Sequence, residues 1–442
     1  MKQIAKQNET FKAWEPTWAN ACVGENGDPQ IYEYASGYAS ATNLLLDQVI
    51  ENEGRSLYVD TLIYPICFNM RHAIELFLKA AAVSLEKLAK IRSTYIPAFD
   101  LLGSHDLGNI WTYVRKHALQ FDLRYIEVMD KLERYVVEVA ETDATGQVFR
   151  YPFDLNNNKH LTSVSAMNVV ILKSRWTILE KLLKHLNRLN EDLLTEYGWG
   201  AFTAKLSRPQ LARIAGMLPW RDQWSSPEFD RMKSVIRGEY RLSCNDFSKA
   251  LNKIQSRREL GALCKHVSLI PGLDANALMQ FFDIWIKKHE LRKIVTSPLE
   301  RDSGFDVSQP DFKEMIAYAE KSTQLKKELV ETIRPDTFAA LFALFYFDRE
   351  DNFSEIFEKL LTQYQKKSLR YTIDRPAYLN DASQLLEKTA ALTSILNSLN
   401  FLGQTDLVNV VIERYKLQDQ VSRLLEESNQ ARQCLVQSGT YI

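Results

Sequence analysis

The chain has 442 residues, of which 45% are hydrophobic and 25% are charged, and its 55 basic residues nearly balance its 56 acidic residues. This balance argues against a protein that binds nucleic acid through its overall charge, but it leaves open a local basic patch. The low content of glycine (16 residues) and proline (13 residues) disfavours a turn-rich β fold and long disordered segments. We therefore expect a soluble, mainly helical protein.

Neither a secretory leader nor a membrane span is expected. The N-terminal 18 residues lack the apolar stretch of a signal peptide. The most apolar run, residues 338–347, is about half as long as the roughly 20 residues that a spanning helix needs, so we expect a buried helix there. The five cysteines are scattered and form no C-x-x-C pair, which disfavours disulfides and a thiolate zinc site. A cytoplasmic location fits best.

An irregular arm is expected over residues 1–30, followed by a helical bundle over residues 31–195. From Tyr32 onward, apolar residues recur at steps of three or four, as on one face of an amphipathic helix. The pattern predicts helices over residues 32–49, 59–85, 107–114 and 122–142. The second of these carries an apolar stripe formed by Leu62, Ile66, Met70, Ala73, Ile74, Phe77, Leu78 and Ala81.

Two connections in this bundle carry signals of their own, the turn before the helix over 107–114 and the loop over 143–161. Ser104 is the expected N-cap of the helix over 107–114. Residues 143–161 form a long loop that contains Gly146 and a run of three asparagines. Loops of this length in a compact domain are more often functional than idle. A long helix is expected to follow over residues 163–194.

The second half of the chain is again helical by its pattern. We expect a domain of short helices over residues 196–300 and a C-terminal helical region over 301–442, with a polar linker over 296–310 and a last long helix over 404–427. Strand-like alternation is nearly absent. The fold class is therefore expected to be all-α, with an N-terminal helical bundle followed by a C-terminal multi-helical domain.

Three short motifs in the first half occur in a characteristic order. The first is NMRHAIELFLKAAAVSLEKL at 69–88, the second is SHDLGNIWTYVRK at 104–116, and the third is VFRYPFD at 148–154. In this order they resemble the HEPN superfamily, whose helical domains carry an acidic residue, an apolar pair and a Lys-Ala step before an "HDL" turn. The matching residues here are Glu75, Leu76, Phe77, Leu78, Lys79, Ala80, His105, Asp106 and Leu107.

The resemblance implies a dimer and, in many members, a metal-independent ribonuclease that serves as a toxin or in anti-phage defence. That activity rests on Arg-x(4–6)-His, because an imidazole moves the proton of a ribose 2′-hydroxyl while a guanidinium holds the phosphate. None of the seven histidines in this chain has an arginine five to seven residues before it. We therefore expect a scaffold or sensor version of the domain, or a rearranged site.

Candidate site residues lie on one predicted helix and in the loops near it. The helix carries Arg71, His72, Glu75 and Lys79, and the loops contribute His105, Asp106 and Arg150. One interpretation is a polar cluster at the base of a ligand cleft. The other is a solvated helix face with ordinary i,i+4 ion pairs, beside an "HDL" turn that caps the next helix.

A rearranged ribonuclease site would use His105, supported by Asp106, and His160 on the long loop. Arg71 or Arg150 would then hold the phosphate. We assign no metal and no cofactor, because H-E-x-x-H, paired Cys/His spacing and the common phosphate-binding loops are all missing. Residues 206–219 resemble the first half of a helix-turn-helix, but the prolines that follow disfavour a recognition helix.

The expected function is that of a HEPN-like protein of a bacterial defence or toxin-type system. It would recognise RNA, a nucleotide or a partner protein without the usual ribonuclease activity. We expect a homodimer or a complex with another protein, with apolar surface supplied by residues 338–347 and Trp111. Two alternatives remain open, an all-helical adaptor subunit and a ribonuclease with a rearranged site. Basic residues converging on His105 or His160 would favour nucleic acid, and a large exposed apolar patch would favour the adaptor.

Overall fold

The computed structural model describes residues 9–53, 55, 58–289, 312–349 and 353–417. These residues form 16 α-helices and no strand, so the prediction of an all-α protein is confirmed. The chain divides into two compact units, Met1–Gly198 and Trp199–Ile442. The division that we expected near residue 300, and the linker around it, fall within 290–311, outside the described residues.

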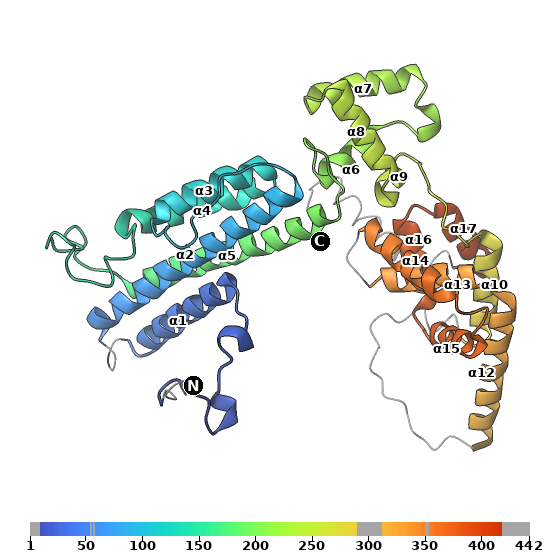
Figure 1. The fold of residues 1–442 in the computed structure, drawn as a ribbon, viewed down its shortest axis with the longest axis horizontal. Helices are drawn as coiled ribbons and strands as arrows, with labels where there is room; N and C mark the ends of the chain where they lie inside the picture. The colour runs from blue at the N-terminus through green and yellow to red at the C-terminus, as the bar shows by residue number, and fades with distance from the viewer. Residues whose placement is uncertain (1–8, 54, 56–57, 290–311, 350–352, 418–442) are drawn as a thin grey trace, which may run out of the picture. The chain divides into compact units, whose positions relative to one another are not determined.

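The first unit is a bundle of five helices: α1 (Ile31–Glu51), α2 (Val59–Ile91), α3 (Leu107–Phe121), α4 (Tyr125–Thr142) and α5 (Val169–Gly198). The longest of them, α2, packs against α1, α3 and α5, and α4 closes the bundle by packing against both α3 and α5. Figure 1 shows α2 and α5 running side by side through the middle of this unit. A side chain on α2 can therefore contact the loops at either end of its neighbours.

The apolar stripe of α2 follows the predicted period. All its members from Ile66 to Ala81 are buried, and Leu62 at the start of the helix is half-buried. Burying one large aliphatic side chain contributes about 1.5–3 kcal/mol, so this stripe anchors α2 in the centre of the bundle.

The N-cap of α3 and the start of α5 both differ from the prediction. Asp106, and not Ser104, is the N-cap of α3, and its carboxylate accepts a hydrogen bond from the backbone N–H of Asn109 at 2.8 Å. Asp106 takes this role because it directly precedes Leu107, the first helical residue. The helix α5 begins at Val169, later than expected, because the Asn168 side chain accepts hydrogen bonds from the backbone N–H groups of Val170 and Ile171. The loop before α5 therefore extends over residues 143–168.

The second unit contains short helices around two apolar clusters. The first cluster, spanning residues 206–264, is built mainly on α6 (Arg208–Met217), α7 (Pro227–Glu239), α8 (Cys244–Gln255) and α9 (Arg258–Leu263). The larger cluster spans residues 270–417. It involves α10 (Ala275–Ile286), α12 (Phe312–Thr332), α13 (Pro335–Phe347), α14 (Ser354–Ser368), α15 (Arg375–Leu386), α16 (Ala391–Phe401) and α17 (Thr405–Tyr415). The helix expected over 404–427 is shorter than predicted: α17 ends at Tyr415, because its C-cap residue Lys416 has a left-handed backbone with φ of 56°. Residues 418–427 lie outside the described residues.

The most apolar run of the chain forms α13, as predicted, and all of its residues from 338 to 347 are buried except Tyr346. Trp111 on α3 is likewise 3% exposed. We expected residues 338–347 and Trp111 to supply apolar surface for assembly. This expectation is wrong, because these side chains are buried in the core of their own unit. Within the described ranges, no helix is both long and apolar enough to cross a membrane.

A buried ionic network links helices of the second unit. The guanidinium of Arg208 on α6, 1% exposed, pairs with both Glu259 on α9 and Glu355 on α14. The guanidinium of Arg257 lies 2.7 Å from Glu355. Burial raises the pKa of the Glu259 carboxyl despite the opposing charge of Arg208, and the negative charge of Glu355 raises it further. These contacts connect the two apolar clusters through charged groups.

Candidate functional site

The charged residues of α2 lie inside the bundle. Arg71, Glu75 and Lys79 follow one another at i,i+4 spacing and are only 2%, 3% and 6% exposed. Lys79 Nζ lies 2.9 Å from Glu75 Oε1, and Arg71 pairs with the other carboxylate oxygen. The predicted ion pairs are therefore present, but the interpretation of a solvated helix face is wrong.

Arg71 connects α2 to two turns. Its Nη2 donates hydrogen bonds to the carbonyl oxygens of His105 at 2.5 Å and Ala144 at 2.7 Å, and its Nε donates to that of Asp143 at 3.2 Å. The backbone N–H of Leu107 also donates to the Ala144 carbonyl at 2.9 Å. These contacts and the pair with Glu75 engage all three guanidinium nitrogens. Arg71 is therefore not available to hold a phosphate, contrary to one of the roles considered for it.

Gly146 gives the long loop room to pass over Arg71. Its φ is +78°, in the left-handed region that favours glycine, and a Cβ atom at this position would lie 3.1 Å from Arg71 Nη1. A larger residue would need both a strained backbone and a displaced guanidinium. The loop and the buried charges thus fit each other closely.

Glu75 also contacts His105, the one exposed member of this cluster. His105 Nδ1 lies 3.1 Å from Glu75 Oε1, and the His105 side chain is 60% exposed. A carboxylate at one ring nitrogen orients an imidazole and fixes its tautomer. Burial alone would raise the pKa of Glu75, but the hydrogen bond from Lys79 and the positive charge of Arg71 outweigh it and hold the pKa below its usual range. The cluster therefore keeps Glu75 ionised.

His72 takes no part in this hydrogen-bonded cluster. Its ring stacks on Phe68 with 5.8 Å between the ring centroids and meets Tyr38 edge-on at 4.4 Å. Burial lowers its pKa, and the charges of Arg71, Lys79 and Arg150 lower it further, although Glu75 acts in the opposite direction. His72 is thus a neutral, aromatic-packed side chain at neutral pH and not a phosphate-binding cation.

The other predicted residues lie on the loops. Asp106 caps α3 and makes no ion pair among the described residues. The exposed Arg150 donates from Nε to the Gly146 carbonyl at 2.7 Å, and its guanidinium lies 5.7 Å from the ring centroid of Phe68. His160 lies near Asp154, and its backbone N–H donates to the Pro152 carbonyl at 3.0 Å. No contact found in the described part of the chain joins His160 to the cluster.

The structure therefore brings together Arg71, Glu75, Lys79 and His105, with Arg150 attached through Gly146. Sequence reasoning missed the backbone of Asp143, Ala144 and Gly146, which surrounds Arg71. The only sequence signal for this contact was Gly146 in the long loop, and a glycine alone does not indicate that its backbone lies against Arg71. Across the described residues, no group of three or more His, Cys, Asp and Glu side chains could hold a metal ion.

A second candidate site lies on the N-terminal arm, described over residues 9–30. Phe11, Trp14 and Trp18 are 85%, 71% and 86% exposed. Two hydrogen bonds close a turn within the arm: the backbone N–H of Trp14 donates to the Asn20 side chain, and the Asn20 amide donates back to the Trp14 carbonyl, both at 2.9 Å. Figure 1 shows the arm looping out from the start of α1.

A groove of about 420 Å³, which we call the α1 groove, lies between the end of the arm and α1. Its lining is formed by Cys22, Val23, Gly24, Pro29, Glu33, Tyr34, Gly37, Tyr38, Ala41 and Asn69. Most of these residues are apolar, aromatic or small. Sequence reasoning described the arm only as irregular, because neither exposure nor a groove has a sequence signature.

Comparison of the chain with protein-family models, with curated proteins and with solved structures gave no match.

Proposed function

We propose that this chain is a HEPN-like assembly protein that pairs with a second copy of itself through the N-terminal arm and does not cleave RNA by the usual chemistry of that superfamily. The observation that carries the proposal is the hydrogen-bonded arm, which exposes Phe11, Trp14 and Trp18 beside a mainly apolar groove. The setting in a bacterial defence or toxin-type system rests on the resemblance alone.

The buried charges support the non-catalytic part of the proposal. Ribonuclease chemistry of this type needs an accessible guanidinium next to an imidazole. Arg71, the guanidinium nearest to Glu75 and His105, is buried and hydrogen-bonded to three carbonyl oxygens. The cluster thus has the properties of a structural junction between α2 and two turns.

The arm supports the assembly part. Large exposed apolar side chains on an ordered segment are a feature of interaction sites, and tryptophan is enriched among the residues that dominate binding energy. A two-fold interface requires that one surface carry both the projecting groups and their receptor. The arm and the adjacent α1 groove meet that requirement, with the aromatic side chains of each copy entering the groove of the other.

Sedimentation velocity of the full chain at micromolar concentration tests this proposal. We expect a dimer for the wild type and an increase of about tenfold or more in its dissociation constant for the Trp14→Ala/Trp18→Ala double variant. Trp220→Ala, which removes a half-exposed tryptophan from the second unit, is the matched control and should leave the dimer intact. A monomeric wild type, or a dimer that the double variant does not weaken, would overturn the proposal.

Binding of RNA or a nucleotide is the second candidate function. The observation that favours it is that His105 and Arg150 are both exposed and are both joined to the turns around Arg71. This pair could contact a phosphate from the surface without the help of Arg71. An assay of RNA cleavage by the purified protein distinguishes catalysis from assembly.

A further inference from the structure

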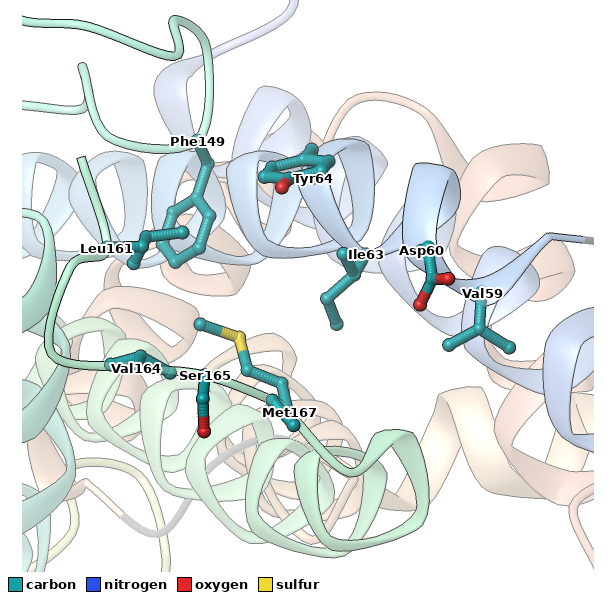
Figure 2. A pocket seen from close by; sticks show the side chains of 10 residues that line it. Val59, Asp60, Ile63, Tyr64, Phe149, Leu161, Val164, Ser165 and Met167 are labelled. Carbon is teal, nitrogen blue, oxygen red and sulfur yellow. The ribbon is translucent and has the colours of Figure 1, made fainter. Parts of the chain in front are cut away.

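Two hollows in the first unit share a wall. The outer hollow, about 290 Å³, lies between the start of α2 and the end of the long loop, and Asp60, Tyr64 and Ser165 supply its polar lining (Figure 2). The inner hollow, about 160 Å³, lies between α2, α4 and α5 and includes Cys67 and Trp176 in its lining. Phe149 and Met167 line both hollows.

The inner hollow is mainly apolar. Its polar rim is formed by Glu138 and Arg175, which pair with each other, and the Arg175 guanidinium also lies 4.9 Å from the ring centroid of Tyr135. Burial raises the pKa of the Cys67 thiol to about 12, and the charge of Asp143 adds to the effect, so the thiol is neutral and acts as part of the apolar wall. Apolar protein cavities of about 150 Å³ stay dry and bind benzene. The inner hollow is thus large enough for one aromatic ring or a short alkyl chain.

The outer hollow has a different character. Its only charged lining residue among those described is Asp60, and the hydroxyl groups of Tyr64 and Ser165 add hydrogen-bonding capacity. A carboxylate with neutral acceptors favours a cationic head group that donates hydrogen bonds and disfavours an anion.

The wall between the hollows includes a flexible side chain. Met167 is an unbranched thioether with three rotatable side-chain bonds, and such side chains readily adopt new conformations. Figure 2 shows the Met167 side chain reaching toward the Phe149 ring. Rotation of Met167 would join the two hollows into one site within the roughly 300–1,000 Å³ range of small-molecule pockets.

We propose that the first unit binds a small amine that carries an aromatic ring or a short alkyl chain. The apolar group occupies the inner hollow, the ammonium group lies in the outer hollow near Asp60, and Met167 moves aside so that one ligand can span both hollows. This site shares no residue with the arm or the α1 groove, so it does not depend on the proposed assembly.

Ligand-observed NMR titration of the full chain with benzylamine, benzyl alcohol and benzoate tests the proposal. For ligands of this size we expect dissociation constants of about 1 mM, tightest for benzylamine and weakest for benzoate. No saturable binding of benzylamine, or benzoate binding as tightly as benzylamine, would overturn the proposal.

Paired variants at Cys67 test the inner hollow. Cys67→Leu fills it and should weaken benzylamine binding about tenfold or more, whereas Cys67→Ala enlarges it and should retain binding. Equal binding by these two variants would exclude the inner hollow as the site.

Asp60→Asn tests the head group at an exposed position whose substitution leaves the core intact. It should weaken benzylamine about two- to fivefold, as for an exposed charge pair, and leave benzyl alcohol unchanged. An equal change for both ligands, or no change for either, would contradict the role of Asp60. The comparison of benzylamine with benzyl alcohol in Asp60→Asn tests the proposal even if Cys67→Leu fails to fold.

Discussion

At the scale of single residues, the carboxylate of Glu75 balances two buried cations and orients an exposed imidazole. A buried ion pair is no more stable than well-packed apolar residues, but removal of one partner leaves an uncompensated charge in the core. Arg71 and Lys79 would both be left in this state without Glu75. The first unit therefore depends on the charge of Glu75 more than on its shape.

We predict that Glu75→Gln lowers the free energy of unfolding of the first unit by about 3–5 kcal/mol, measured by urea titration. The matched control is Glu127→Gln on α4, which also removes a glutamate from an i,i+4 pair with lysine, but at the surface. The control should leave the unfolding midpoint unchanged. Equal effects of the two substitutions would show that burial of the cluster contributes nothing.

Gly146 provides a second test at this scale. We predict that Gly146→Ala destabilises the first unit by about 1–3 kcal/mol, because it places a Cβ at positive φ and against the Arg71 guanidinium. Gly198→Ala on α5, where nothing lies within 4 Å of the added atom, should have no such cost. Thermal unfolding of both variants measures the difference, and a neutral Gly146→Ala would contradict the proposed fit between loop and guanidinium.

At the scale of elements, another buried network of the first unit joins the start of α4 to the end of α5. The Arg124 guanidinium donates to Asp122 at 2.9 Å and to Glu196 at 2.8 Å, and the Tyr197 hydroxyl donates to Asp122 at 2.8 Å. Burial alone would raise the pKa of Asp122, but the hydrogen bonds and charge of Arg124 outweigh it, so the pKa lies below its usual range. The two helix ends are thus held together by a carboxylate that must stay ionised.

This network predicts a pH dependence of stability. Since the folded-state pKa of Asp122 lies below its unfolded value, its contribution is fully present above about pH 4 and is lost as the pH falls through the lowered pKa. We expect the free energy of unfolding to fall below pH 4, and less steeply in Asp122→Asn. Asp130→Asn at the exposed surface should retain the wild-type slope. If the free energy of unfolding fell equally steeply with pH in all three proteins, the proposed contribution of Asp122 would be contradicted.

The sequence predicted most helices because their signals are local. The stripe of α2 and the apolar run of α13 follow from spacing and hydrophobicity within one segment. The burial of Arg71, Glu75 and Lys79 was not predictable in this way, because the same i,i+4 pattern is typical of a solvated face. The carbonyl groups that surround Arg71 come from turns more than 30 residues away in the chain, so only the folded arrangement distinguishes the two cases.

At the scale of the whole molecule, we propose that the first unit binds partners and ligands and that its buried polar cluster has a structural role. His105 contacts Glu75, but the arginine beside them is buried and engaged, and His160 contributes nothing to the cluster in the described residues. The resemblance to the HEPN superfamily therefore extends to the order of motifs and not to its catalytic pair. In the proposed function, the exposed aromatic side chains of the arm form the interaction site, although the sequence patterns assigned no role to the arm.

The claim that the protein does not cleave RNA is tested most directly by incubating purified protein with labelled single-stranded RNA in the presence of a chelator. We predict no cleavage above that of a His105→Ala/His160→Ala control, since loss of a positioned acid–base group typically costs about 10²–10⁴ in rate. Robust cleavage by the wild type that disappears in His105→Ala or His160→Ala would contradict it and establish a rearranged ribonuclease site.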